Sequence, residues 1–205
     1  MLNRDVRAIL FDIGQVIVPV YPRRAAEVLA RNARLAADEI LAAVRSHPLL
    51  GEFQLGRISP ESWYEEMSQL LGLKISFLEF IAAWNLVLGE QTLLPEELFE
   101  RLAAKRRLVL LSNTDAIHVA RMEQVFRFPR SFSARLYSCA VGLAKPDPAI
   151  YARAIEAAGA APGEILYIDD VPEYVEAGRR AGLQVHHFQG AQPLLAELRA
   201  RGLLD

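Results

Sequence analysis

The sequence predicts an α/β fold in which a parallel β-sheet core is interrupted by an all-helical insertion. Five short runs are rich in isoleucine, leucine and valine, and their hydrophobicity is nearly continuous, which is typical of strands covered on both faces. Helical patterns lie between the later runs, so strands and helices alternate. Residues 19–91 break this alternation because they contain helical patterns only. The predicted strands are Ala8–Phe11, Leu108–Leu111, Arg135–Ser138, Ile165–Ile168 and Gln184–Phe188.

Four helical patterns predict the segments that connect the strands of the core. One precedes the second strand, one follows it, and the other two lie on either side of the fourth strand. Connections between parallel strands are right-handed in nearly all proteins, so the expected topology is a right-handed α/β sheet. The predicted helices are Glu96–Ala104, Ala116–Phe126, Pro148–Ala158 and Glu173–Ala181.

The insertion carries four further helical patterns. One has a clear start signal, with Ser59 placed to cap the helix and Pro60 at its first position. A helical block that follows the first strand of a parallel sheet lies above the carboxyl ends of the strands, where such sheets bind ligands. We therefore expect a core of residues 1–18 and 92–205 and a helical cap of residues 19–91. The cap patterns are Arg23–Ala33, Asp38–Ser46, Pro60–Leu71 and Ser76–Leu88.

Composition and charge exclude several classes of protein. The 205 residues carry a formal net charge of −2, so the chain lacks the basic excess of a nucleic-acid-binding protein. Its single cysteine, Cys139, excludes an internal disulfide and is typical of a reducing compartment. The first residues show no signal-peptide cleavage site, and no apolar stretch is long enough to span a bilayer. We expect a cytoplasmic monomer or homodimer with no nucleic-acid or membrane partner.

Polar residues follow four of the predicted strands at the point where each strand ends. Asp12 closes the first strand, Ser112-Asn113-Thr114 the second and Asp169-Asp170 the fourth, while Lys145 follows the third. Each of these alone is more often a structural cap or turn residue. Because the carboxyl ends of parallel strands meet at one edge of a sheet, their joint placement predicts a functional site there.

These residue types suit phosphoryl transfer through a covalent aspartyl intermediate. The Asp12 carboxylate is a nucleophile that needs no deprotonation at neutral pH. Attack on a phosphate requires its charge to be offset, and Mg²⁺ prefers hard oxygen ligands such as carboxylates and backbone carbonyls. Asp12, Asp170 and the Gly14 carbonyl are the candidate metal ligands. Ser112 is a candidate donor to phosphoryl oxygens, and Lys145 a candidate to neutralise charge.

Four segments also carry a resemblance to a known family. FDIGQVIV, LLSNTD, GLAKPDPAIY and YIDDVPEYVEAG resemble, in order and spacing, the four motifs of the haloacid dehalogenase-like hydrolase superfamily. Within these segments, FD-x-G followed by LSNT and GL-x-KPD-x-x-IY is most similar to the α-D-glucose-1-phosphate phosphatase-like and epoxide hydrolase N-terminal phosphatase-like group of that superfamily. The resemblance implies a Rossmann-like core with a helical cap, Mg²⁺ as cofactor and a small phosphorylated metabolite as substrate. A sugar phosphate is one candidate.

The same resemblance implies a role for each residue of the site. It makes Asp12 the nucleophile and Lys145 the charge-neutralising lysine. It makes Asp170 a metal ligand and places the adjacent Asp169 in the same metal-binding set, either on the ion itself or beside its ligands. It also makes Ser112 the phosphate-binding hydroxyl, and we place the adjacent Asn113 in the phosphate-binding set.

One position departs from the family pattern. Most phosphatases of this superfamily have a second aspartate two residues after the nucleophile, where it protonates the leaving alcohol and later activates water. This chain has Gly14 there. Loss of a general acid–base typically costs about 10²–10⁴-fold in rate. Two alternatives to a phosphatase therefore stay open: a metal-independent 2-haloacid dehalogenase that uses the same aspartate, and a non-catalytic phosphate-binding protein.

The cap is expected to set substrate choice because it closes over the strand ends. Its polar residues most suited to face the site are His47, Glu52, Gln54 and Arg57. Arg57 is the candidate for binding a substrate hydroxyl or phosphate, although a solvated loop arginine is the more common case. Trp84 is expected in the cap core, and His118 is expected to border the pocket. His186 and His187 are interpreted as structural and remote from the motifs.

Overall fold

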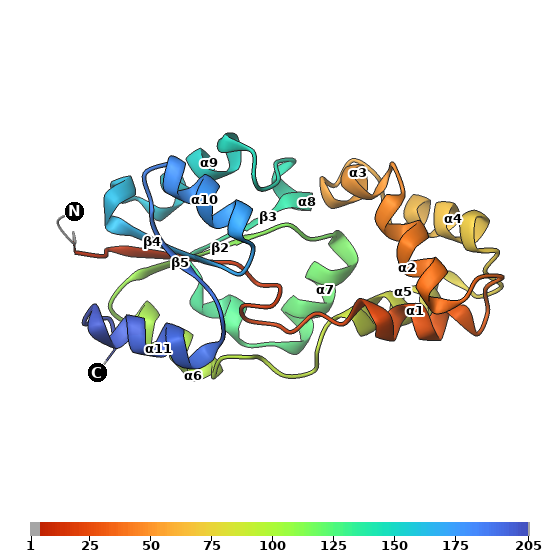
Figure 1. The fold of residues 1–205 in the computed structure, drawn as a ribbon, viewed down its shortest axis with the longest axis horizontal. Helices are drawn as coiled ribbons and strands as arrows, with labels where there is room; N and C mark the ends of the chain where they lie inside the picture. The colour runs from red at the N-terminus through yellow and green to blue at the C-terminus, as the bar shows by residue number, and fades with distance from the viewer. Residues whose placement is uncertain (1–4, 205) are drawn as a thin grey trace.

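The computed structural model describes residues 5–204 and confirms the predicted α/β architecture. Five parallel strands form one sheet in the order β3-β2-β1-β4-β5, with the first strand at its centre (Figure 1). All four pairings are parallel, so the carboxyl ends of the strands share one edge. The strands are β1 (Ala8–Phe11), β2 (Arg107–Ser112), β3 (Ala134–Tyr137), β4 (Ile165–Asp169) and β5 (Gln184–His187).

Alternate side chains of the central strand point into two different cores. Ile9 and Phe11 belong to one core, whereas Ala8 and Leu10 belong to the other. Both faces are therefore buried, which explains the continuous apolar runs in the sequence. The first face is covered by α6 (Glu96–Ala103), α7 (Ala116–Val125) and α11 (Ala191–Ala200), and the second by α9 (Pro148–Ala158) and α10 (Pro172–Arg180) (Figure 1).

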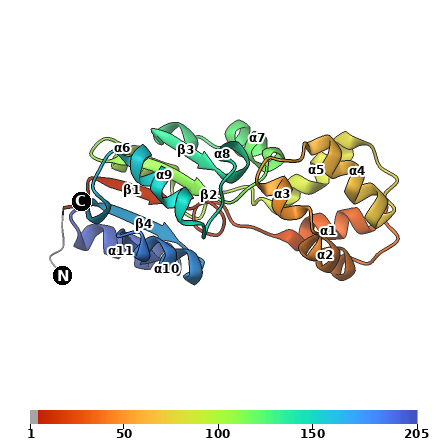
Figure 2. The ribbon, with the colours of Figure 1, turned by 90° about the horizontal axis from the view of Figure 1, so that it is seen from above.

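A second group of helices lies beside the carboxyl edge of the sheet (Figures 1 and 2). It consists of α1 (Pro22–Ala30), α2 (Ala37–Ser46), α3 (Leu50–Gln54), α4 (Pro60–Leu71), α5 (Phe77–Trp84) and the 3₁₀ turn η1 (Asn85–Val87). These helices have a hydrophobic core of their own, centred on aromatic rings. Phe53 stacks on Trp63 with ring centroids 5.0 Å apart, and Phe80 stacks on Trp84 at 5.5 Å. We refer to this group as the helical unit.

Two chain segments run side by side where the helical unit joins the sheet. Val20 and Leu88 form an isolated antiparallel bridge, and Gly89 donates its backbone N–H to the Pro19 carbonyl at 2.8 Å. The predicted helix start at Ser59 is confirmed, because its hydroxyl accepts a hydrogen bond from the Ser62 backbone N–H. The helical unit is thus tied to the sheet through a narrow paired connection.

Some element boundaries differ from the sequence prediction. Helix α1 ends at Ala30 rather than Ala33, because the following chain turns toward α4 and Arg34 donates its backbone N–H to the Leu71 carbonyl. Ser138 starts a short helix, α8 (Ser138–Val141), instead of ending the third strand. Its buried hydroxyl accepts from the Thr114 backbone N–H at 2.9 Å, which fixes the chain in a turn.

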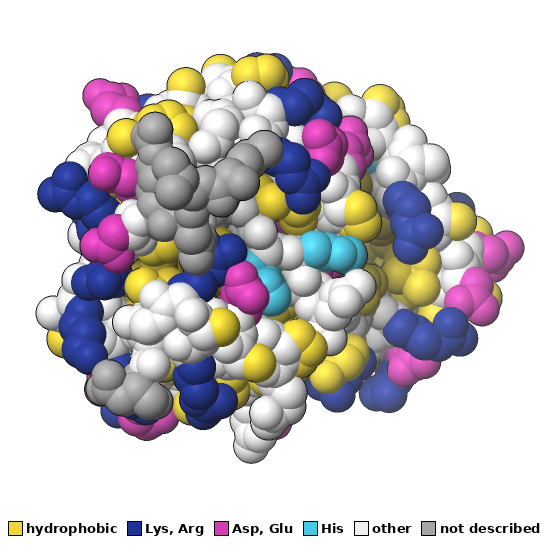
Figure 3. All heavy atoms as spheres, turned by 60° about the vertical axis from the view of Figure 1, so that its left-hand side comes forward, with side chains coloured by type: hydrophobic (Ala, Val, Ile, Leu, Met, Phe, Trp, Pro, Cys, Tyr) yellow, Lys and Arg dark blue, Asp and Glu magenta, His cyan; other side chains and the backbone are white. Residues whose placement is uncertain are grey.

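The surface carries intermixed charges. On the face seen in Figure 3, Lys and Arg side chains alternate with Asp and Glu. Within residues 5–204, no helix has the length and apolar character needed to cross a membrane.

Candidate active site

The residues at the centre of the candidate site are Asp12, Lys145 and Asp169. Asp12 directly follows β1, and its backbone N–H donates to the Ile168 carbonyl of the neighbouring β4 at 2.9 Å. The Lys145 ammonium lies 2.7 Å from Asp12 Oδ1 and 2.6 Å from Asp169 Oδ2. All three side chains are buried. Burial of an unpaired charge is costly, so each group depends on the others for its ionised form.

Asp169 holds the lysine in place. Besides Lys145, its Oδ2 atom accepts a hydrogen bond from the Tyr167 hydroxyl, and its Oδ1 atom accepts one from the Val171 backbone N–H at 2.8 Å. Both carboxylate oxygens are therefore occupied. Lys145 also lies 5.0 Å from the centre of the Tyr174 ring, in a cation–π arrangement.

Three carboxylates face this single ammonium group. One oxygen each from Asp12, Asp169 and Asp170 lie within 4.8 Å of one another. Burial raises the pKa of Asp12 to about 6, with Lys145 opposing the shift and Asp169 adding to it. Burial also raises the pKa of Asp170, and the charge of Asp169 adds to that shift. An excess of hard oxygen ligands over cations fits Mg²⁺, and Asp12 and Asp170 are the residues that would hold it.

Ser112 and Asn113 follow the end of β2 but do different things. The Ser112 hydroxyl makes no hydrogen bond to any residue between 5 and 204, so it is available to a ligand. The Asn113 amide instead forms two hydrogen bonds with the backbone of Lys145. Its Oδ1 accepts from the Lys145 N–H and its Nδ2 donates to the Lys145 carbonyl, both at 2.8 Å. The side chain expected to bind phosphate therefore orients Lys145.

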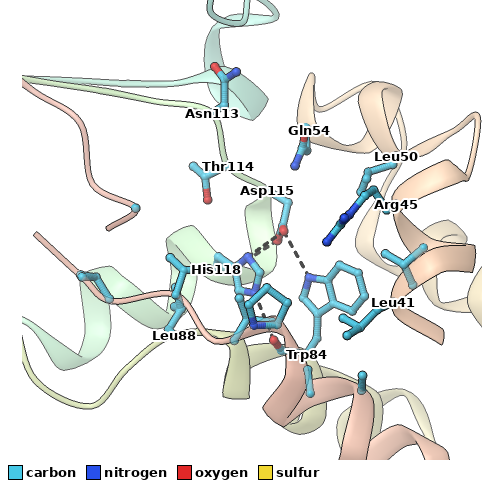
Figure 4. Close-up of a pocket in the computed structure, with 18 of the residues that line it drawn as sticks. Leu41, Arg45, Leu50, Gln54, Trp84, Leu88, Asn113, Thr114, Asp115 and His118 are labelled. Carbon is cyan, nitrogen blue, oxygen red and sulfur yellow. Dashed lines mark hydrogen bonds and ion pairs between the residues drawn. The ribbon is translucent and has the colours of Figure 1, made fainter. Parts of the chain in front are cut away.

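A cavity of about 310 Å³ extends from these strand ends into the helical unit (Figure 4). Gly14 and Ser112–Asp115 line its sheet side. Its opposite wall is mainly aliphatic, with two polar side chains, Arg45 and Gln54, aimed inward in Figure 4. The aliphatic wall includes Leu29, Ile40, Leu41, Val44 and Leu50.

Only one of the four polar cap residues expected at the site lines this cavity, and that residue is Gln54. Arg57 is exposed and pairs with Glu52 at 3.0 Å, so the structure does not bring either to the pocket. His47 packs edge-on against Trp63, with ring centroids 5.4 Å apart.

Sequence reasoning missed Arg45. It lies four residues after Leu41, which places both on one face of α2, so helical periodicity offered a signal for it.

The junction between the helical unit and the sheet is a hydrogen-bonded triad of Trp84, Asp115 and His118 (Figure 4). Asp115 Oδ2 accepts from Trp84 Nε1 at 3.2 Å and lies 2.8 Å from His118 Nδ1. His118 Nε2 lies 3.1 Å from the Trp84 carbonyl oxygen. Since both ring nitrogens face acceptors, the geometry favours a doubly protonated imidazolium.

The electrostatics of the triad agree with that assignment. Burial alone would lower the pKa of His118, but the Asp115 carboxylate outweighs burial and the pKa is raised. Burial alone would raise the pKa of Asp115, but the charge of His118 outweighs it and the pKa is lowered. His118 borders the cavity as expected, and Trp84 packs in the core of the helical unit while also lining the cavity.

A second contact joins the helical unit to the sheet through α3 and α8. Ser138 donates its hydroxyl toward the Gln54 carbonyl, at 2.6 Å. Gly56 packs so closely on Cys139 that a Cβ at position 56 would lie 2.0 Å from the Cys139 carbonyl oxygen. We call this contact the α3–α8 latch.

His187 is closer to the site than the sequence prediction placed it. β5 pairs directly with β4, with His187 opposite Asp169, and His187 Nε2 lies 3.0 Å from the Asp170 carbonyl oxygen. The prediction that His187 is remote from the motifs is therefore wrong. The last strand of the chain is the immediate neighbour of the strand that carries Asp169 and Asp170, which sequence position alone does not reveal.

Fold and site together place a buried carboxylate–ammonium pair and an acidic cluster at the carboxyl edge of a Rossmann-like sheet. The chain belongs to the haloacid dehalogenase-like hydrolase family, whose model matches residues 6–182. It is therefore a hydrolase, as the sequence motifs predicted.

Individual relatives are distant. The chain is 23% identical, over 87% of its length and 90% of the relative's, to a D-ribitol-5-phosphate phosphatase of Bacteroides thetaiotaomicron. A family enzyme of that organism, solved in complex with magnesium and inorganic phosphate, has a TM-score of 0.79 at 23% identity, covering 91% of this chain and 96% of that chain. L-2-haloacid dehalogenase of Xanthobacter autotrophicus has a TM-score of 0.62 at 21% identity, covering 96% and 83%. These structural likenesses establish the shared fold.

Proposed function

We propose that the protein is a Mg²⁺-dependent phosphatase that hydrolyses a small phosphorylated metabolite. The observation that carries the proposal is the buried Asp12–Lys145 pair beside the Asp169–Asp170 acidic cluster, next to a cavity that Gly14 and Ser112 line. The magnesium and phosphate bound by the family enzyme of Bacteroides thetaiotaomicron support the same chemistry. We propose residues 19–91 as the cap over this site, in a protein of the cytoplasm.

The geometry supports the following roles for this chain's residues in the proposed reaction. Lys145 occupies Asp12 Oδ1, which leaves Oδ2 to attack phosphorus. As the new O–P bond forms, the bond between phosphorus and the ester oxygen breaks and the alcohol leaves with that electron pair. Water then attacks phosphorus, which releases inorganic phosphate and restores the carboxylate. When bound, Mg²⁺ offsets the negative charge of the phosphate.

The leaving alcohol lacks a dedicated proton donor. Among the described residues, Asp115 is the one carboxyl lining the cavity, and it is engaged by Trp84 and His118. Position 14, which carries the acid in most phosphatases of the superfamily, is Gly14 here and offers no side chain. We propose that water protonates the leaving oxygen, which favours substrates whose alcohol departs easily.

The direct test is phosphate release from an aryl phosphate. We expect turnover with Mg²⁺, none with chelator, and none in Asp12→Asn. Asp38→Asn, at an exposed carboxylate of the helical unit, is the matched control and should behave as wild type. Release of halide from a 2-chloroacid that survives chelation would replace the phosphatase with the dehalogenase alternative. A phosphate-dependent rise in melting temperature without any turnover would favour the non-catalytic binding protein.

A further inference from the structure

The wall of the cavity offers few partners for hydroxyl groups. Two of its polar side chains next to the sheet are already engaged: Asn113 with the Lys145 backbone, and Asp115 with His118 and Trp84. The Ser112 hydroxyl is the candidate donor to the phosphate, which leaves the Thr114 hydroxyl as the one further hydroxyl that the described residues contribute on that side of the cavity. The helical unit contributes mostly aliphatic side chains. A buried hydroxyl that finds no partner loses its hydrogen bonds to water and gains nothing in return. The cavity therefore disfavours a polyol chain and favours an apolar carbon skeleton.

Arg45 is the one charged side chain that the described part of the helical unit contributes to this wall. Arg45 is exposed as a residue, and its guanidinium points from α2 toward the cavity, on the side of Trp84 and below Gln54 in Figure 4. Between residues 5 and 204 it has no ion pair or hydrogen bond, whereas Arg23 pairs with Asp38 and Arg57 pairs with Glu52. Its five N–H donors are arranged to receive a planar anion in a bidentate manner.

Taking the proposed phosphatase as given, we infer that the substrate is a phosphate monoester with an apolar chain and a carboxylate at its far end. Asp12 and Lys145 act on the phosphate, and the aliphatic wall covers the chain. Arg45 binds the carboxylate with help from the Gln54 amide. The volume of about 310 Å³ lies at the lower end of the range for small-molecule sites, so the substrate is a small metabolite. Arg45 is thus a specificity residue.

Turnover of matched substrates tests this assignment. The panel is a homologous series of ω-carboxyalkyl phosphates, alkyl phosphates of the same lengths, and ribitol 5-phosphate. We expect the carboxylated esters to exceed the alkyl esters in kcat/KM by roughly tenfold, the size of one charge-assisted hydrogen bond, and ribitol 5-phosphate to be the poorest. Arg45→Ala should lower kcat/KM for the carboxylated esters by roughly tenfold, to the level of the alkyl esters of the same length. Arg31→Ala, at an exposed arginine of the helical unit that does not line the cavity, should retain the preference.

Two results of this panel would overturn the inference. An equal loss on all esters in Arg45→Ala would mean that Arg45 contacts the transferred phosphate instead. A polyol ester that outperforms the carboxylated series would mean that the wall is not selective for apolar chains.

Binding separates this inference from the proposed catalysis. ω-Carboxyalkyl phosphonates and alkyl phosphonates are not hydrolysed, so calorimetry in the presence of Mg²⁺ reports recognition alone. Tighter binding of the carboxylated phosphonates, lost in Arg45→Ala, would support the inference even if no ester were turned over. Equal affinities for both series would overturn it even if aryl phosphates were good substrates.

Discussion

Placing an aspartate at position 14 tests whether a missing proton donor limits this enzyme. A Cβ at Gly14 would lie 3.5 Å from Val20 Cγ2 and 4.0 Å from Asp12 Oδ2, both ordinary contacts. Gly14 also lies outside the left-handed backbone region, so the substitution adds no backbone strain. The new carboxyl stands beside Asp12, and a like charge at that distance favours its protonated form, as a general acid requires.

The expected gain follows from what general acid–base catalysis contributes. A positioned acid is typically worth about 10²–10⁴-fold, and the largest effect falls on substrates whose alcohol leaves poorly. We expect Gly14→Asp to raise kcat for an alkyl phosphate by at least about tenfold and to change kcat for a nitrophenyl phosphate by less than about threefold. The assay compares both substrates in wild type and variant, with Mg²⁺ at saturation. Gly14→Asn, which adds similar bulk without an acid, is the control.

Two outcomes would refute this reasoning. Equal fractional gains on both substrates would show that leaving-group protonation is not the deficit. The same gain in Gly14→Asn would show that added bulk, rather than an acid, improves the site.

Three further predictions concern the metal ligands and the two contacts of the helical unit. Asp170→Asn should raise the Mg²⁺ concentration for half-maximal activity, and unchanged metal dependence would remove Asp170 from the site. His118→Gln should cost about 2 kcal/mol in urea unfolding below pH 6.5. Because the folded-state pKa is raised, this difference should shrink as pH rises through it, and a constant difference would refute an imidazolium. Gly56→Ala, with a backbone φ of +70°, should lower the melting temperature and raise KM through a weakened α3–α8 latch.

The sheet could be predicted from the sequence because a strand buried on both faces leaves an uninterrupted apolar run. β1 and β4 are such strands, and polar residues stand directly after each. The sequence therefore predicts Asp12 and Asp169 at one edge of the sheet, where both contact the Lys145 ammonium. Apolar runs do not reveal which strands pair with one another, so the order of the strands could not be predicted from them. That gap is why His187 was wrongly separated from Asp170, although β5 is the neighbour of β4.

The helical unit was predictable only in outline. Its longer helices show a repeating apolar face, but α3 has five residues and is too short for a period to be recognised. Arg57 and Arg45 illustrate the consequence. Arg57 follows the loop-forming Gly56 and was predicted to face the site. In the structure it is exposed and forms an ion pair with Glu52 at the surface. The arginine that reaches the cavity lies on the apolar face of α2, next to Leu41 in helical register.

The short segment between β2 and α7 connects the candidate phosphate site to the helical unit that lines the rest of the cavity. β2 ends at Ser112, and within three residues the chain supplies Asp115, which caps α7 and binds both His118 and Trp84. The segment that carries the Ser112 hydroxyl, which we propose for the phosphate, therefore also carries the Asp115 contact to the helical unit. A rotation of that unit would move Arg45 relative to Asp12 and would disturb the hydrogen bond from Trp84 to Asp115. On the proposed function, the distance between Arg45 and Asp12 therefore depends on this junction together with the α3–α8 latch. A weakened junction should degrade selectivity for chain length before it affects hydrolysis of a small aryl phosphate.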